Sequence, residues 1–118
     1  MNNKLKMIKG YDGSGFYIKR LKNYILVISN SVSNPFEYIY ELGKEIDKLS
    51  KKIDNSQVQI IFDLTPFMKK KTIFLMFYDK NKKNLDINSK KNLTEEEIPL
   101  PVKNFLLQTK TTLAQGCR

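Results

Sequence analysis

Few side chains in this sequence are of the kinds that carry out chemistry. Its 118 residues include no histidine, and Cys117 is the only cysteine. Without an imidazole base the chain can form neither a Ser-His-Asp triad nor a Cys-His pair. A zinc site would also have too few ligands. We therefore expect a protein that is not an enzyme, with no catalytic, cofactor-binding or metal-binding residues and no small-molecule substrate.

Carboxylates are the remaining candidates for acid–base or metal chemistry. Asp63 ends an apolar run, where a carboxylate needs a partner or an exposed position. We interpret it as structural, held by a hydrogen bond or by a lysine of residues 69–71, with a catalytic acid as the alternative. Glu95, Glu96 and Glu97 form the only acidic cluster, but consecutive residues of a helical turn point in different directions. They are interpreted as a helix start or an acidic surface, with partner binding as the second possibility.

Glycines at positions 10, 13 and 15 superficially resemble a phosphate-binding loop. The dinucleotide-binding loop follows a strand and opens a helix, whereas here a strand is expected to follow, and the glycine spacing differs. Glycine also supplies the positive φ that tight loops need. The segment 10–15 therefore predicts a turn.

Lysine dominates the charge of the chain. The formal net charge is +9, with 21 Lys and Arg against 12 Asp and Glu. The excess lies in residues 1–33 and 58–93, and a basic surface favours polyanions. If a strand over 71–79 pairs with one over 85–87, lysines gather at the two ends of one hairpin. The possible polyanion patch is then Lys69, Lys70, Lys71, Lys80, Lys82 and Lys83, with a solvated surface as the equally open interpretation.

The elements that would position these groups follow from apolar patterning. Aromatic and β-branched runs predict strands over 16–18, 24–28, 58–64, 71–79 and 85–87. The first two should form a hairpin through residues 20–23. The run at 24–28 lacks alternation, which indicates burial on both faces of a sheet, and the run at 58–64 should be central.

Two helices complete the pattern. Asn34, Pro35 and Glu37 form a helix start with an N-cap, a proline at the first position and a capping-box acid. This helix should run to about residue 51, and helical spacing predicts the buried stripe Phe36, Ile39, Gly43, Ile46 and Leu49. A last helix from Pro101 should bury Val102, Phe105, Leu106, Thr109 and Leu113.

The order β-β-α-β-β-β-α predicts one α+β domain over residues 1–118. We expect a mostly antiparallel sheet with both main helices packed on one face. No run of apolar residues is long enough to span a membrane, and the basic start without an apolar segment leads us to expect no secretion signal. A lone cysteine fits a reducing compartment, so the expected location is the cytoplasm.

Residues 24–105 resemble the RnlB family of bacterial antitoxins, which neutralise RnlA-type ribonuclease toxins. The resemblance covers about two thirds of the chain. Residues 65–71 differ from the family's pattern, which implies a different partner if this loop contacts the toxin. The matching features, in order, are a strand ending in Val27-Ile28-Ser29-Asn30-Ser31, the Asn34-Pro35 helix start, Ile61-Phe62-Asp63-Leu64, Phe74-Leu75-Met76-Phe77, Leu85-Asp86-Ile87, and a helix after Ile98-Pro99.

The resemblance implies an antitoxin or immunity protein that binds a cognate nuclease toxin and blocks it sterically. An inhibitor that covers a basic nuclease cleft presents acidic groups to it. The alternative function is a small basic nucleic-acid-binding module that uses the lysine patch. The expected partner-binding residues, each of which could equally be ordinary surface, are Tyr78, Asp79, Glu95, Glu96 and Glu97.

Overall fold

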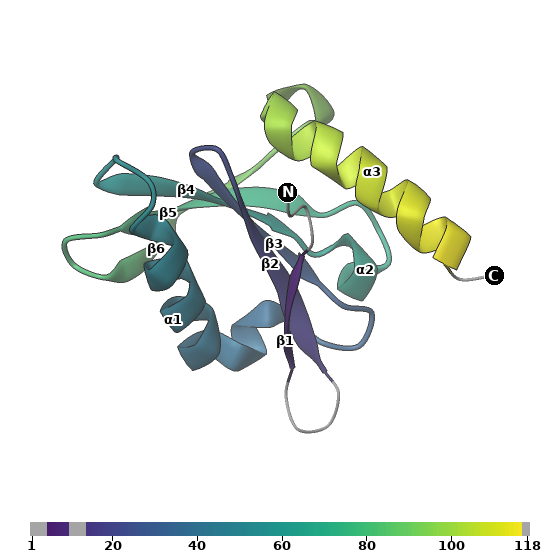
Figure 1. Ribbon diagram of the computed structural model, residues 1–118, viewed down its shortest axis with the longest axis horizontal. Helices are drawn as coiled ribbons and strands as arrows, with labels where there is room; N and C mark the ends of the chain where they lie inside the picture. The colour runs from purple at the N-terminus through teal and green to yellow at the C-terminus, as the bar shows by residue number, and fades with distance from the viewer. Residues whose placement is uncertain (1–4, 10–13, 117–118) are drawn as a thin grey trace.

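A single sheet of six strands runs through the middle of the structure, with helices on both sides of it (Figure 1). This computed structural model describes residues 5–9 and 14–116, and side chains up to Gln108. Neighbouring strands are antiparallel except β3 and β4, which are parallel. Across the sheet, the strands lie in the order β1 (Lys6–Lys9), β2 (Gly15–Leu21), β3 (Tyr24–Ser29), β4 (Gln57–Asp63), β5 (Ile73–Asp79) and β6 (Asn84–Asn92).

The helices lie between β3 and β4, between β4 and β5, and after β6. The predicted α+β class, the mostly antiparallel sheet and the two main helices are confirmed. In chain order the helical segments are the 3-10 helix η1 (Pro35–Tyr38), α1 (Ile39–Ser50), the single turn α2 (Thr65–Met68), the 3-10 helix η2 (Glu95–Glu97) and α3 (Leu100–Gly116).

The parallel pair β3 and β4 lies at the centre of the sheet and is buried on both faces. Ile25, Leu26 and Val27 are each 0% exposed, and Ile60 and Ile61 of β4 are equally buried. Such strands need no alternation of apolar and polar residues, because both of their faces contact apolar layers. The unbroken apolar runs predicted this two-sided burial correctly.

Two separate apolar cores follow from this arrangement. Ile25 and Val27 pack with Leu42 and Ile46 of α1 on one face of the sheet. Leu26 packs with Val102 and Leu106 of α3 on the other face. The prediction that both helices share one face is therefore wrong, since two-sided strands need a layer on each side.

The buried stripe predicted for the first helix is confirmed in part, because Ile46 is buried and Phe36 and Leu49 pack against the same core. Leu42 and Ile46 are fully buried, whereas Ile39 is 55% exposed and Gly43 is half-buried. The first turn, η1, is a 3-10 helix, and Tyr38 at the junction has φ −120° and ψ 47°. A 3-10 turn holds three residues rather than 3.6, so counting at α-helical spacing from Phe36 misplaces Ile39, and Leu42 takes the buried position.

The start of this helical segment is nevertheless the one that the sequence predicts. The backbone N–H of Phe36 donates to Asn34 Oδ1 at 2.9 Å. The backbone N–H of Asn34 in turn donates to Glu37 Oε2 at 3.4 Å. This reciprocal capping box satisfies donors that a helix N-terminus otherwise leaves unpaired.

The edges of the sheet differ most from expectation. β1 was not predicted, because four residues are too few to establish a pattern. The predicted strand at 85–87 is part of the longer β6, whose remaining residues are mostly exposed and polar and so gave no strand signal. The β2–β3 hairpin is confirmed, and pairing of Leu21 with Tyr24 reduces its turn to Lys22 and Asn23.

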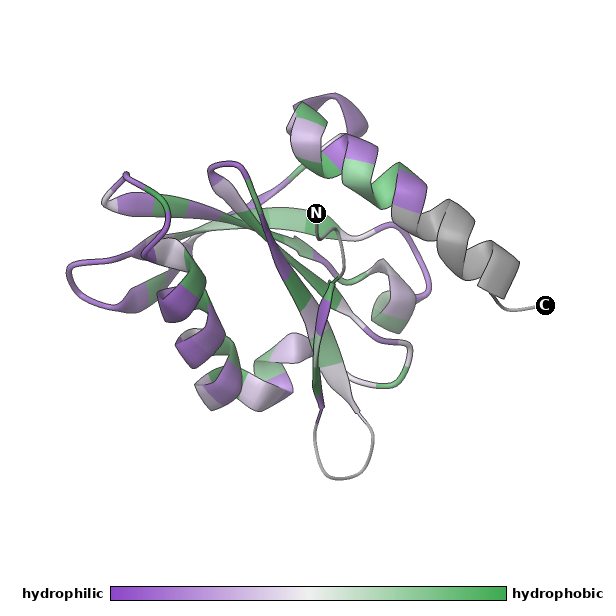
Figure 2. Ribbon diagram, in the orientation of Figure 1, coloured by the Kyte–Doolittle hydropathy of each residue, from purple (hydrophilic) through white to green (hydrophobic). Residues whose placement is uncertain are grey.

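Hydrophobic residues concentrate on the strands in the middle of the molecule, while turns and the outer side of α1 are hydrophilic (Figure 2). None of the helices formed by the described residues is long and apolar enough to cross a membrane.

Alanine substitutions in α1 test the observed phase of the helix. Leu42→Ala should lower the free energy of unfolding by about 2–5 kcal/mol, because Leu42 is fully buried. Ile39→Ala should lower it by no more than about 0.5 kcal/mol, since Ile39 is mostly exposed. Urea denaturation of both variants measures the difference. Equal losses of unfolding free energy in the two variants would contradict the observed burial of Leu42 and exposure of Ile39.

Candidate functional site

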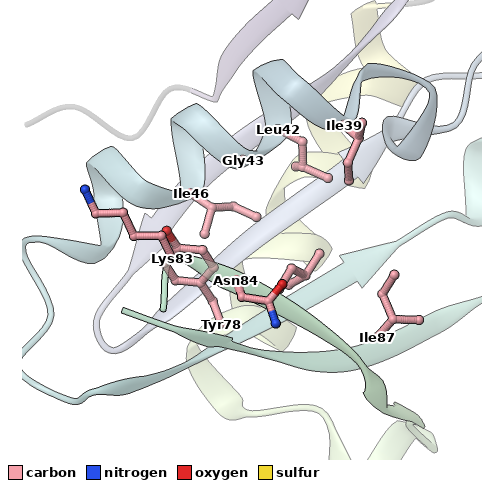
Figure 3. Close-up of a pocket in the computed structure, with 9 residues that line it drawn as sticks. Ile39, Leu42, Gly43, Ile46, Tyr78, Lys83, Asn84 and Ile87 are labelled. Carbon is pink, nitrogen blue, oxygen red and sulfur yellow. The ribbon is translucent and has the colours of Figure 1, made fainter. Parts of the chain in front are cut away.

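A groove of about 290 Å³ lies between α1 and the outer strands of the sheet (Figure 3). From α1, the side chains of Ile39, Leu42 and Ile46 are directed toward the strands, and Gly43 adds no side chain to this wall. The strand side of the groove is formed by Tyr78 of β5, Lys83 before β6, and Asn84, Leu85 and Ile87 of β6.

The groove exposes apolar surface at two facing positions. Ile39 is 55% exposed and Ile87 is 64% exposed, and they come from opposite walls. Leu85 alternates with Asp86 along β6, so Leu85 and Ile87 share the face that α1 covers. Single exposed apolar residues are common on protein surfaces, so the position of these two on opposite walls of one groove is what makes them candidates for binding.

Tyr78 forms part of the floor of the groove. Its side chain is 3% exposed, and its hydroxyl donates to Asp47 Oδ1 at 3.0 Å. Burial and the nearby Asp47 carboxylate together raise the pKa of Tyr78 to about 12, because both disfavour the phenolate. The hydrogen bond ties α1 to β5 at one end of the groove.

One lysine lines the groove, and two more lie on the elements that form its walls. Lys83 lines it at one end, with Ile87 toward the other (Figure 3). Further along β6, Lys90 Nζ lies 4.6 Å from the ring centroid of Phe74, a residue of the core that faces α1. On α1, Lys44 Nζ lies 5.1 Å from the ring centroid of Tyr40. The residues that line the groove include one lysine and no acid.

The predicted polyanion patch is divided into two groups in the structure. One group precedes β5 and the other follows it, so the seven residues of that strand separate them by about 23 Å. Lys69 Nζ donates to the carbonyls of Ser31 and Pro66, and Lys71 pairs with Glu95. Lys80 Nζ donates to the carbonyl of Ile53. The groups are Lys69, Lys70 and Lys71 at one end of β5, and Lys80, Lys82 and Lys83 at the other.

The expected partner-binding residues have structural roles in the molecule. Tyr78 is buried and contacts the outside only as part of the floor of the groove, so its role in partner binding stays a prediction. Asp79 accepts hydrogen bonds from the backbone N–H groups of Asn81 and Lys82, which hold the pKa of its carboxyl below the usual value. These bonds organise the turn between β5 and β6.

The acidic cluster is likewise engaged with neighbouring residues. Glu97 accepts the backbone N–H of Thr94 at 2.8 Å and pairs with Lys91, and both contacts lower the pKa of its carboxyl. Glu95 pairs with Lys71, and Glu96 is exposed. The predicted helix start is present as a single 3-10 turn, Glu95–Glu97, which Thr94 and Glu97 close as a capping box. Among the described residues, no three carboxylate or thiol side chains group closely enough to hold a metal ion.

Asp63 is a buried structural residue. Its side chain is 3% exposed, and Oδ1 accepts the backbone N–H of Thr65 at 3.0 Å. The predicted hydrogen bond is therefore present, with the backbone rather than a lysine as its donor. This bond fixes the sharp exit of the chain from β4 into α2.

Several expectations fall on residues that the structure does not describe. The predicted turn includes residues 10–13, and Cys117 also lies outside the described chain. The side chains of Thr109 and Leu113 are likewise not described, whereas the burial of Val102 and Leu106 is confirmed.

Gly15, at the start of β2, has φ +151°, and a Cβ there would lie 1.9 Å from the carbonyl oxygen of Ile8.

The groove itself was missed by sequence reasoning. Ile39 and Gly43 were assigned to the core, and Ile87 was placed in a short strand with no prediction of which side chains face the core. The signal that could have indicated an apolar face on β6 is the spacing of Leu85 and Ile87 around Asp86 in an otherwise polar segment.

Comparisons of this chain with models of protein families, with curated proteins and with solved structures found no match. The groove and its surroundings are therefore interpreted from their own chemistry.

The Tyr78 hydrogen bond gives a pH-dependent prediction. Tyr78→Phe should lower the free energy of unfolding by about 1 kcal/mol at neutral pH, because the bond to Asp47 is lost. An unfolded tyrosine ionises near pH 10.0, whereas folded Tyr78 stays neutral until about pH 12. The wild-type advantage is thus complete below pH 10 and should disappear between pH 10 and 12.

Urea denaturation of both proteins at several pH values measures this difference. Tyr40→Phe is the matched control, because it removes a hydroxyl from a residue that is 70% exposed. A constant gap between wild type and Tyr78→Phe up to pH 12 would show that the hydroxyl ionises normally.

Proposed function

We propose that this chain is a binding protein of the antitoxin or immunity class, which neutralises a nuclease toxin by forming a stoichiometric complex with it. One observation carries the binding role: the groove between α1 and β6 leaves Ile39 and Ile87 more than half exposed. The toxin-neutralising role is supported by the resemblance of residues 24–105 to the RnlB family.

The groove supports protein binding for a physical reason. Burying an exposed isoleucine side chain in an interface yields about 1.5–3 kcal/mol. Affinity in protein complexes concentrates in a few such central contacts, surrounded by polar groups that exclude water. Ile39 and Ile87 are suited to be these contacts, and the polar residues Lys83 and Asn84 line the same groove.

Nucleic-acid binding is the second candidate, and the net charge of +9 favours it. The lysines of the predicted patch nevertheless lie in two groups at opposite ends of β5. Lys71 is paired with Glu95 as well, which reduces the charge of one group. A continuous basic track along a phosphate backbone is therefore less well supported than a protein interface.

Co-expression tests the proposed function. The reading frames on either side of the gene are expressed alone and together with this chain in a bacterial host. We expect one neighbour to stop growth when expressed alone, growth to be restored by this chain, and the two proteins to purify as a complex of fixed stoichiometry.

A salt titration distinguishes the second candidate. Nucleic-acid binding would weaken by roughly 0.7–0.9 log units per log unit of salt for each phosphate that is neutralised. Nucleic acid that co-purifies with this steep salt dependence, together with neighbours that do not affect growth, would refute toxin neutralisation.

A further inference from the structure

We infer that the groove between α1 and β6 binds an acidic amphipathic helix of the partner protein, through apolar side chains that enter between Ile39 and Ile87. This inference rests on the proposed function, which it extends by naming the surface and the chemistry of the partner segment. Ile39 and Ile87 stand on opposite walls with Leu42, Ile46 and Leu85 below them.

The layer on this face of the sheet leaves a groove open between α1 and β6. Six strands at about 4.8 Å spacing form a sheet roughly 24 Å wide, whereas one helix with its side chains is about 10 Å across. The backbone of α1 packs mainly over β2 and β3. The part of the same face over β5 and β6 is where the groove opens, beside α1 and along it (Figure 3).

The size of the groove fits side chains rather than a whole ligand. Its volume of about 290 Å³ is at the lower end of the roughly 300–1,000 Å³ typical of small-molecule sites. Residues four positions apart on a helix lie about 5–6 Å from each other on one face. Two apolar side chains of one helical turn would thus enter together.

The charges around the groove select an acidic partner. Lys83 lies at one end of the groove, Lys90 lies further along β6 on the same face, and Lys44 lies on the outer side of α1. No acid lines the groove, and Asp47 beside it accepts the Tyr78 hydroxyl and pairs with Lys51 at 3.8 Å. Acidic residues before and after the apolar turn of the partner helix would face these lysines.

A strand or a second copy of this chain fits the site less well. β6 carries Lys90 and Lys91, and its pairing with β5 is irregular between Leu75 and Phe77. Charged side chains and irregularities of this kind oppose the addition of another strand at a sheet edge. Two copies of a chain with a net charge of +9 would also repel each other.

A peptide selection tests the inference. The immobilised full chain is exposed to a display library of 16-residue peptides that share a helix-forming framework and vary along one face. We expect enriched peptides to carry two apolar residues one helical turn apart, with aspartate or glutamate on both sides. Enriched neutral or basic peptides, or no enrichment, would overturn the inference.

Substitutions at matched positions localise the binding. Ile87→Glu and Ile39→Glu should each weaken binding of the enriched peptide on the order of tenfold, as measured by fluorescence anisotropy. Val32→Glu is the control, because it places the same charge at a residue that is 70% exposed and does not line the groove. Equal binding by the Ile87→Glu and Val32→Glu variants would overturn the assignment of the groove.

A second pair of matched variants tests how much a lysine of the groove contributes to peptide binding. Lys83 and Lys22 have φ values of 51° and 55°, a region that asparagine tolerates well. Lys83→Asn should weaken binding of the acidic peptide about threefold, and Lys22→Asn, in the β2–β3 turn, should leave it unchanged. Equal effects would show that only the overall charge matters, which contradicts a site at the groove.

Two further results separate this inference from the proposed function. If Ile87→Glu leaves toxin neutralisation intact, the groove assignment fails while the proposed function stands. If acidic helices bind at the groove but no neighbouring gene product is toxic, the proposed function fails alone. A dimer in sedimentation that Ile87→Glu dissociates would assign the groove to a second copy and overturn the inference.

Discussion

Burial of the parallel strands β3 and β4 on both faces is the constraint on which the rest of the structure depends. Ile25 and Val27 face α1, whereas Leu26 and Ile28 face α3. If either pair of side chains stayed exposed to water, the fold would lose about 0.8 kcal/mol of hydrophobic stabilisation for each CH₂ group that is now buried. The chain therefore needs a helix on each side of the sheet, and both main helices are committed to covering this central pair.

Covering the centre leaves one edge of the sheet incompletely covered. One helix is too narrow for a face of six strands, so α1 over β2 and β3 leaves an opening beside β5 and β6. The Tyr78–Asp47 hydrogen bond ties α1 to β5 at the end of this opening. The groove is thus a consequence of the proportions of helix and sheet, and Ile87 makes its outer wall apolar.

The charge of each part of the surface depends on local pairing between residues rather than on the total composition of the chain. Glu95 and Glu97 pair with Lys71 and Lys91, so the acidic cluster that suggested a surface facing a basic nuclease is largely neutralised within the molecule. The groove, in contrast, has lysines around it. In our proposal the partner therefore offers an acidic surface, and the toxin is held through a region other than a basic RNA-binding cleft.

The sequence by itself determined the local elements. The unbroken run at 24–28, the Asn34 capping box and the Thr94–Glu97 turn each depend on neighbouring residues, and each was predicted correctly. Tertiary structure decided which face each helix covers, the exposure of Ile39, the burial of Tyr78 and the existence of the groove. These features depend on contacts between residues far apart in the chain, such as Tyr78 with Asp47, and a local pattern carries no information about such pairs.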